Sequence, residues 1–79
     1  MTVDAGWHIL QSTMLRAIAY DPATRELRVR FHSGGMYRYH GVPPEVVTNL
    51  LDPPDGSPGR YFNDTIRDGY DYDEVRPAD

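Results

Sequence analysis

The residues best suited to binding chemistry lie in one short segment, LRVRFHSGGMYRYH, at residues 27–40. Arginine binds phosphates in a bidentate manner and stacks on planar groups, and tyrosine rings stack on nucleic-acid bases. A surface that combines the two side chains can bind nucleic acid. The segment supplies five candidate binding residues, namely Arg28, Arg30, Arg38, Tyr37 and Tyr39.

Whether these residues share a surface depends on how the segment pairs with itself. Apolar and polar residues alternate on both sides of the SGG triplet, which predicts a β-hairpin. A three-residue loop, 33–35, pairs Phe31 with Tyr37 and Arg30 with Arg38, so tyrosines and arginines lie on opposite faces. A two-residue loop moves the pairing by one residue and brings the tyrosines onto the arginine face. We favour the three-residue loop, because it gathers the apolar residues and the tyrosines on one buried face.

A second candidate site is the segment SPGRYFND, residues 57–64. Ser57 and the proline that follows it predict a helix start, where free backbone amides can bind an anion. Arg60 lies beside this helix start, and Asn63 and Arg67 follow one and two turns later. These residues can hold a phosphate, although an ordinary capped helix explains the same pattern.

Other kinds of site find little support. The chain has no cysteine, so disulfides and thiolate metal sites are excluded. His32 and His40 have no third ligand at a convincing spacing, so we expect no metal. No nucleophile and base are placed for catalysis, and we expect a protein that is not an enzyme and has no cofactor. No apolar run approaches the roughly 20 residues of a membrane helix, and the cysteine-free composition fits a cytoplasmic protein.

The charge is unevenly distributed along the chain. The formal net charge is −4, and all eight basic residues are arginines. Residues 1–51 hold five arginines and four acids (+1), whereas residues 52–79 hold three arginines and eight acids (−5). Any basic footprint for nucleic acid must therefore be local, and the acidic half suits a basic protein partner.

The elements that position these residues follow from periodicity and turn signals. The 79 residues predict one small domain. A first strand from about Thr13 to Tyr20 leads through the turn DPATRE into the hairpin. A helix is predicted within GVPPEVVTNLLD, and a second helix runs from Ser57 to a stop near Gly69. This order predicts an α+β fold, a three-stranded antiparallel meander followed by two short helices packed on one face.

The same patterns predict a core and segment boundaries. Residues 1–11 are expected to be a flexible segment, residues 12–72 the domain, and residues 73–79 an acidic tail. Near this end, Tyr72 and Val75 are the residues that we expect to be able to dock onto the domain. The predicted core consists of Leu15, Ile18, Leu27, Val29, Phe31, Val42, Val47, Leu50, Leu51, Phe62 and Ile66.

The order of several short motifs resembles the KTSC domain family. The matching features are Ser12, the Tyr20–Asp21 strand end, Tyr37 and Tyr39, Gly41-Val42-Pro43, Ser57 with Gly59, Tyr61-Phe62-Asn63, Ile66-Arg67 and Tyr70. The family is named for its occurrence at the C-terminus of some lysyl-tRNA synthetases, and it also occurs as small free-standing bacterial proteins. The resemblance implies no known function beyond a suggestion of RNA binding.

These observations predict a non-catalytic binding module, with RNA or another nucleic acid bound by the arginine face. The alternative is a small acidic protein-interaction module whose partner is a basic protein. An inhibitor from a phage or mobile element, acting on a host defence nucleoprotein complex, is one form of that alternative.

Overall fold

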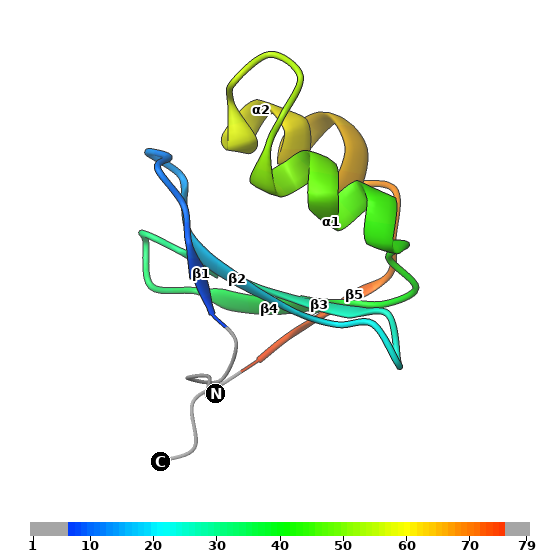
Figure 1. Ribbon diagram of the computed structural model, residues 1–79. Helices are drawn as coiled ribbons and strands as arrows, with labels where there is room; N and C mark the ends of the chain where they lie inside the picture. Colours follow the sequence, from blue (N-terminus) through cyan, green and yellow to red (C-terminus); the bar gives the residue numbers. More distant parts are fainter. Residues whose placement is uncertain (1–6, 76–79) are drawn as a thin grey trace.

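The computed structural model describes residues 7–75 and has an α+β fold in which the helices lie over one face of an antiparallel sheet (Figure 1). The sheet has five strands in the order β1-β2-β3-β4-β5, so each strand pairs with its neighbours along the chain, and the helices connect β4 to β5. The strands are β1 His8–Ile9, β2 Leu15–Asp21, β3 Glu26–Phe31, β4 Met36–Tyr39 and β5 Tyr72–Glu74. The helical elements are α1 Pro44–Leu51, α2 Pro58–Tyr61 and the π-helix η2 Phe62–Ile66.

The three predicted strands are present, but the prediction of a three-stranded sheet was wrong because two short edge strands extend it. β1 pairs with β2 and β5 pairs with β4, both antiparallel. Strands of two and three residues are too short to show a convincing alternation in sequence. They pair with the open edges of β2 and β4, so the sheet extends beyond the predicted 12–72 domain at both ends. Residues 1–6 of the predicted flexible segment and residues 76–79 of the predicted acidic tail lie outside the described residues.

The β3–β4 hairpin has the predicted loop length in a different position. The Phe31 carbonyl accepts from Gly34 N–H, and Phe31 N–H donates to the Gly35 carbonyl, so the three loop residues are 32–34 and not 33–35. Gly34 takes a φ of 104°, a conformation that favours glycine. The residue opposite Tyr37 is consequently Val29, and not the predicted Phe31.

The correction in register does not change which face each side chain occupies. When a three-residue loop moves by one position, each residue of β3 pairs with a β4 residue two positions away from the predicted one. Because side chains alternate with a period of two, each side chain keeps its predicted face. The tyrosines therefore stay on the face of Val29, as predicted. The predicted Arg30–Arg38 pair is replaced by Arg28 opposite Arg38, with Met36 opposite Arg30.

The core lies between the helices and the sheet and matches most of the predicted residues. Leu51 is the exception at 40 % exposure, while its neighbour Leu50 is completely buried. Successive helix residues are about 100° apart around the axis, so Leu50 faces the sheet and Leu51 turns away from it. Phe31 is only half-buried. Leu10 and Tyr39 are buried members of the core that the prediction did not list.

The second predicted helix begins as expected and then changes geometry. Ser57 caps it, with its Oγ accepting from Arg60 N–H at 3.3 Å, and Pro58 is the first helical residue. After Tyr61 the helix widens into the π-helix η2, and Arg67 N–H bonds to the carbonyl of Phe62, five residues back. Such π-helical turns are rare in proteins as a whole, but those that occur are often found at functional sites. Within residues 7–75, no helix is long and apolar enough to span a membrane.

The two adjacent leucines of α1 provide a matched test of this packing. Leu50→Ala leaves a cavity in the core and is expected to lower the free energy of unfolding by about 2–5 kcal/mol. Leu51→Ala, at the more exposed position, is expected to cost less than about 1 kcal/mol. Urea denaturation followed by circular dichroism measures both values, and equal losses would contradict the described orientation of α1.

Candidate nucleic-acid interface

The face of the sheet that the helices leave uncovered carries the three predicted arginines of the hairpin (Figure 1). Arg28 and Arg38 lie opposite each other on β3 and β4, and Arg30 lies on the same face two residues further along β3. Leu27 and Val29, which alternate with them, are completely buried on the helical side. The sheet therefore separates a charged outer face from an apolar inner face, as the hairpin pattern predicted.

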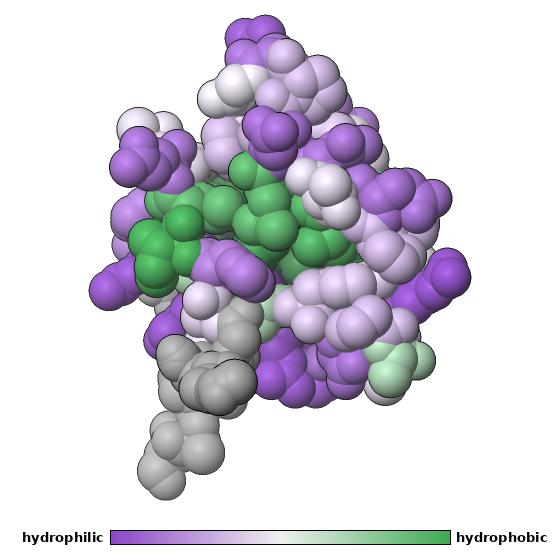
Figure 2. Space-filling view, viewed as in Figure 1, coloured by the Kyte–Doolittle hydropathy of each residue, from purple (hydrophilic) through white to green (hydrophobic). Residues whose placement is uncertain are grey.

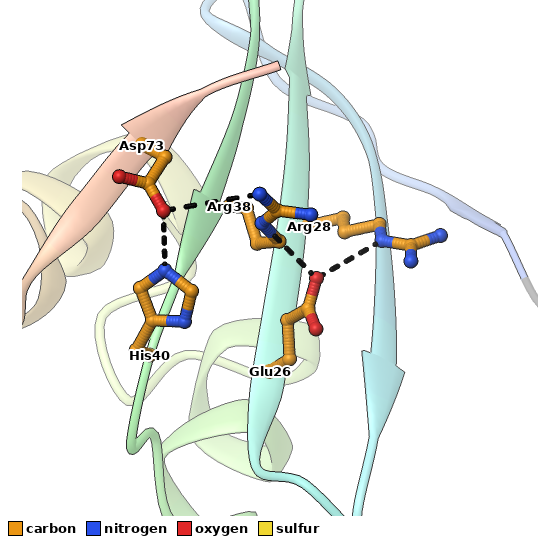
Figure 3. A network of polar contacts seen from close by, with 5 residues as sticks. All are labelled: Glu26, Arg28, Arg38, His40 and Asp73. Carbon is orange, nitrogen blue, oxygen red and sulfur yellow. Dashed lines mark hydrogen bonds and ion pairs between the residues drawn. The ribbon is translucent and has the colours of Figure 1, made fainter.

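Two acidic side chains that lie close by in space, Glu26 and Asp73, balance the charges of Arg28 and Arg38. Glu26 Oε2 lies 3.3 Å from Arg28 Nε and 3.4 Å from Arg38 Nε (Figure 3). Asp73 Oδ2, on β5, lies 3.8 Å from Arg38 Nη2 and 2.8 Å from His40 Nε2. The cross-strand pair of like charges is thus bridged by Glu26, and Asp73 links β5 to β4. Partly exposed ion pairs of this kind contribute about 0–1 kcal/mol each, so they exchange readily for other anions.

One donor in this cluster has no hydrogen-bond partner among the described residues. Arg38 Nε lies within ion-pair distance of Glu26 Oε2, but its geometry does not make a hydrogen bond. A buried donor without a partner is costly. Because this nitrogen is itself buried, its missing hydrogen bond is a cost of the arrangement and not a donor open to a ligand.

Arg30 has a different environment from the other two arginines. Its guanidinium carbon lies 5.3 Å from the ring centroid of Trp7, a cation–π distance. No ion pair within residues 7–75 includes Arg30 or the exposed Arg16 of the neighbouring strand. The end of the outer face near Trp7 therefore combines a cation without an acidic partner and a large aromatic ring.

The predicted binding residues Tyr37 and Tyr39 lie on the inner face, away from the arginines of β3 and β4. Tyr39 is only 3 % exposed, and Tyr37 is half-buried. Tyr37 meets Phe31 edge-to-face at 5.6 Å, and Tyr39 meets Phe62 of η2 in the same way at 5.4 Å. The two tyrosines thus belong to an aromatic cluster between the sheet and η2.

Tyr72 of β5 completes this cluster. Its ring lies 5.7 Å from Tyr37 and 5.3 Å from Tyr39, although the residue is 54 % exposed. A pocket of about 440 Å³ opens among these rings and the helical side. Figure 2 shows hydrophobic surface between the helical layer and the sheet, so the helices do not close over the whole inner face. The pocket is lined by Met14, Phe31, Tyr37, Tyr39, Phe62, Asn63, Arg67, Asp68 and Tyr72.

The predicted anion site is divided between two hollows. Asn63 and Arg67 line the aromatic pocket, whereas Ser57 and Arg60 line a neighbouring hollow, which Asn63 also borders. Ser57 Oγ is engaged in capping, and Arg60 Nη1 lies 3.9 Å from Asp55 Oδ2. The helix α2 itself has only four residues before it widens. The structure therefore places Arg67 with the tyrosines, Ser57 and Arg60 at the neighbouring hollow, and Asn63 at the border of both.

Several residues outside the predicted binding set shape the two faces. Glu26 and Asp73 set the charge of the outer face together with the arginines, Trp7 adds a ring beside Arg30, and Asp68 borders the pocket. The sequence offers Glu26 and the acidic tail as possible partners of the arginines, whereas it gives no sign of a role for Asp68. The sequence of β5 carries no clear alternation, because Tyr72 and Glu74 share the inner face and only Asp73 points outward. No local pattern indicates that Asp73 meets Arg38, because the two residues are 35 positions apart. Among residues 7–75, no three histidine or acidic side chains gather as metal ligands.

Comparisons with known proteins agree on one family. The model of the KTSC domain matches residues 11–76. An uncharacterized protein of Stutzerimonas stutzeri is 50 % identical over 58 residues, which is 73 % of this chain and 79 % of that protein. A lysine–tRNA ligase of Nostoc punctiforme is 29 % identical over 65 residues, 82 % of this chain but only 11 % of the ligase.

A solved structure extends the comparison to the fold. The crystal structure of a KTSC domain protein from Yersinia pestis matches with a TM-score of 0.82 and 28 % identity. The match covers 89 % of this chain and 96 % of that chain. The α+β arrangement described above is therefore shared with an independent member of that family.

The buried position of Tyr39 gives a testable pH dependence. Burial, with smaller contributions from Tyr72 and Tyr37, raises the pKa of Tyr39 from 10.0 to about 12. Unfolded chains lose this proton at lower pH than folded ones, so the free energy of unfolding should fall as pH rises from 10.0 to about 12. Tyrosinate absorbance and urea denaturation across this range measure both effects. Tyr39→Phe should remove the absorbance transition near pH 12 and flatten the decline in the free energy of unfolding. The control Tyr61→Phe should keep both the transition and the decline.

Proposed function

The chain belongs to the KTSC domain family, and on this basis we propose that it is a non-catalytic module that binds RNA across the uncovered face of its sheet. The observation that carries the proposal is the row of Arg28, Arg30 and Arg38 on a face without helices, with the Trp7 ring beside Arg30. Aromatic rings on an exposed sheet stack on bases, and arginines bind the phosphates of the same strand.

The relatives support RNA as the ligand class. Two lysine–tRNA ligases, from Nostoc punctiforme and Nostoc sp., contain a stretch similar to this chain. These enzymes act on tRNA, as their name says. A domain of this kind within such an enzyme is well placed to contact RNA, although this argument rests on association.

The acidic residues of the outer face must give up their ion pairs with the arginines when RNA binds. Glu26 and Asp73 neutralise Arg28 and Arg38 in the free protein, and their ion pairs are weak because they are partly exposed. An RNA phosphate then replaces a carboxylate at the guanidinium groups of Arg28 and Arg38, while Arg30 has no acidic partner to displace among residues 7–75. Such binding weakens as salt rises, because counterions are released from the RNA.

Fluorescence anisotropy of a labelled single-stranded RNA at low and physiological salt tests this proposal. Arg30→Ala is expected to weaken binding about three- to tenfold, and the triple change of Arg28, Arg30 and Arg38 to alanine should abolish it. Glu26→Gln should tighten binding, because it frees two arginines. Arg60→Ala removes the same charge from an exposed helical position and should leave binding nearly unchanged.

Two outcomes would contradict the proposal. Equal losses in Arg30→Ala and Arg60→Ala would mean that net charge, and not the outer face, governs binding. No binding even at low salt would exclude RNA as the ligand of the outer face. The other predicted class, an acidic module that binds a basic protein such as a host nucleoprotein, would then be the proposal to test.

A further inference from the structure

We propose that the aromatic pocket between η2 and strands β4 and β5 binds a nucleoside monophosphate. The pocket opens on the inner side of the sheet, whereas the arginines of the proposed RNA surface lie on the outer side. The inference therefore does not depend on RNA binding by the outer face. It rests on the shape of the pocket, on its aromatic walls and on the polar side chains that line it.

The walls of the pocket suit a flat aromatic ring. Its volume of about 440 Å³ lies within the range of small-molecule sites. Tyr39 and Tyr72 are inclined at only 33° to each other, while Tyr37 stands at 63° to Tyr72. Ring faces and edges of several tyrosines thus border the same space. A nucleobase can stack on such rings, because every base has a flat π-face.

The tyrosine hydroxyls of the pocket are open to a ligand. Among the described residues, the hydroxyls of Tyr37, Tyr39 and Tyr72 form no hydrogen bond, whereas Tyr20 bonds to the Val42 carbonyl at 2.6 Å. The Tyr37 and Tyr39 hydroxyl oxygens are not shut off from solvent, and Tyr72 is 54 % exposed. A tyrosine hydroxyl can donate and accept, so these groups can bond to the polar edge of a ligand.

The helical side of the pocket offers groups that fit a nucleotide. Arg67 takes part in no ion pair within residues 7–75, so its guanidinium is available to a phosphate. The Asn63 amide nitrogen donates one weak hydrogen bond to the Met14 sulfur, at 4.0 Å, which leaves its second N–H and its carbonyl oxygen for a base edge. Asp68 adds a carboxylate that can accept from the N–H groups of a base.

The charged side chains that line the pocket favour nucleotides with one phosphate group. One arginine matches one phosphate group, and the neighbouring Asp68 repels further negative charge. This favours a monophosphate over a diphosphate or triphosphate. A purely apolar ligand would leave Arg67 and Asn63 unpaired, and a free anion would leave the tyrosine rings uncovered. The same group can come from a free nucleotide or from the end of an RNA strand.

Nuclear magnetic resonance of the isotope-labelled full chain distinguishes these cases. The four ribonucleoside 5′-monophosphates, ribose 5-phosphate, inorganic phosphate and a short RNA with a 5′-phosphate are titrated separately. We expect at least one nucleotide to shift the amide signals of Tyr37, Tyr39, Asn63 and Arg67 in a saturable way. Arg67→Ala should weaken this binding about tenfold, and the exposed Arg60→Ala should not change it. Tyr72→Ala, at an exposed strand position, should weaken it as well.

The same titrations identify a wrong proposal. Equal shifts with inorganic phosphate would mean an anion site without base recognition, and no shift with any nucleotide would exclude the proposed ligand. Stronger shifts with the RNA than with free nucleotides, still lost in Arg67→Ala, would assign the RNA end as the source. RNA binding by the outer face is lost in the triple arginine variant and retained in Arg67→Ala, so the two proposals fail separately.

Discussion

The length of the β3–β4 loop is the constraint on which both surfaces of this protein depend. Phe31 and Gly35 close a three-residue loop, and Gly34 supplies the backbone conformation that the loop needs. An odd loop length keeps Tyr37 and Tyr39 on the face of Leu27 and Val29. One residue more or less would exchange the faces and place the tyrosines among the arginines. The separation of aromatic and charged chemistry therefore follows from the geometry of one turn.

This separation gives the sheet two different chemical faces. The inner face holds the core and an aromatic cluster that extends from Phe31 to Tyr72. The outer face holds arginines whose charges are partly balanced by Glu26 and Asp73. A domain with a net charge of −4 thus carries a local basic surface, because its acids are placed mainly in the second half of the chain.

The π-helix and the edge strand β5 adapt the inner face for binding. The wider turn at 62–66 places Phe62 against Phe31 and Tyr39, with Asn63 and Arg67 at the pocket. β5 adds Tyr72 to the aromatic wall and Asp73 to the ion pairs of the outer face. A strand of three residues therefore contributes to both faces, because its side chains alternate like those of longer strands.

The sequence by itself determined the class of fold, the three central strands, the helix starts and the face of each hairpin residue, because these follow from local periodicity and turn chemistry. It predicted the burial of Leu50 and Phe62 but not the exposure of Leu51, since the exact rotation of a helix depends on what it packs against. Only the tertiary structure decided the register of the hairpin, the pairing of β1 and β5, and the meeting of Asp73 with Arg38. It also decided that Asn63 and Arg67 join the tyrosines while Ser57 and Arg60 do not. Asp73 and Arg38, like Arg67 and Tyr37, are far apart in the chain, and no local pattern of residue types encodes the distance between them. The hairpin register joins nearer positions, but its residue types fit more than one placement of the loop.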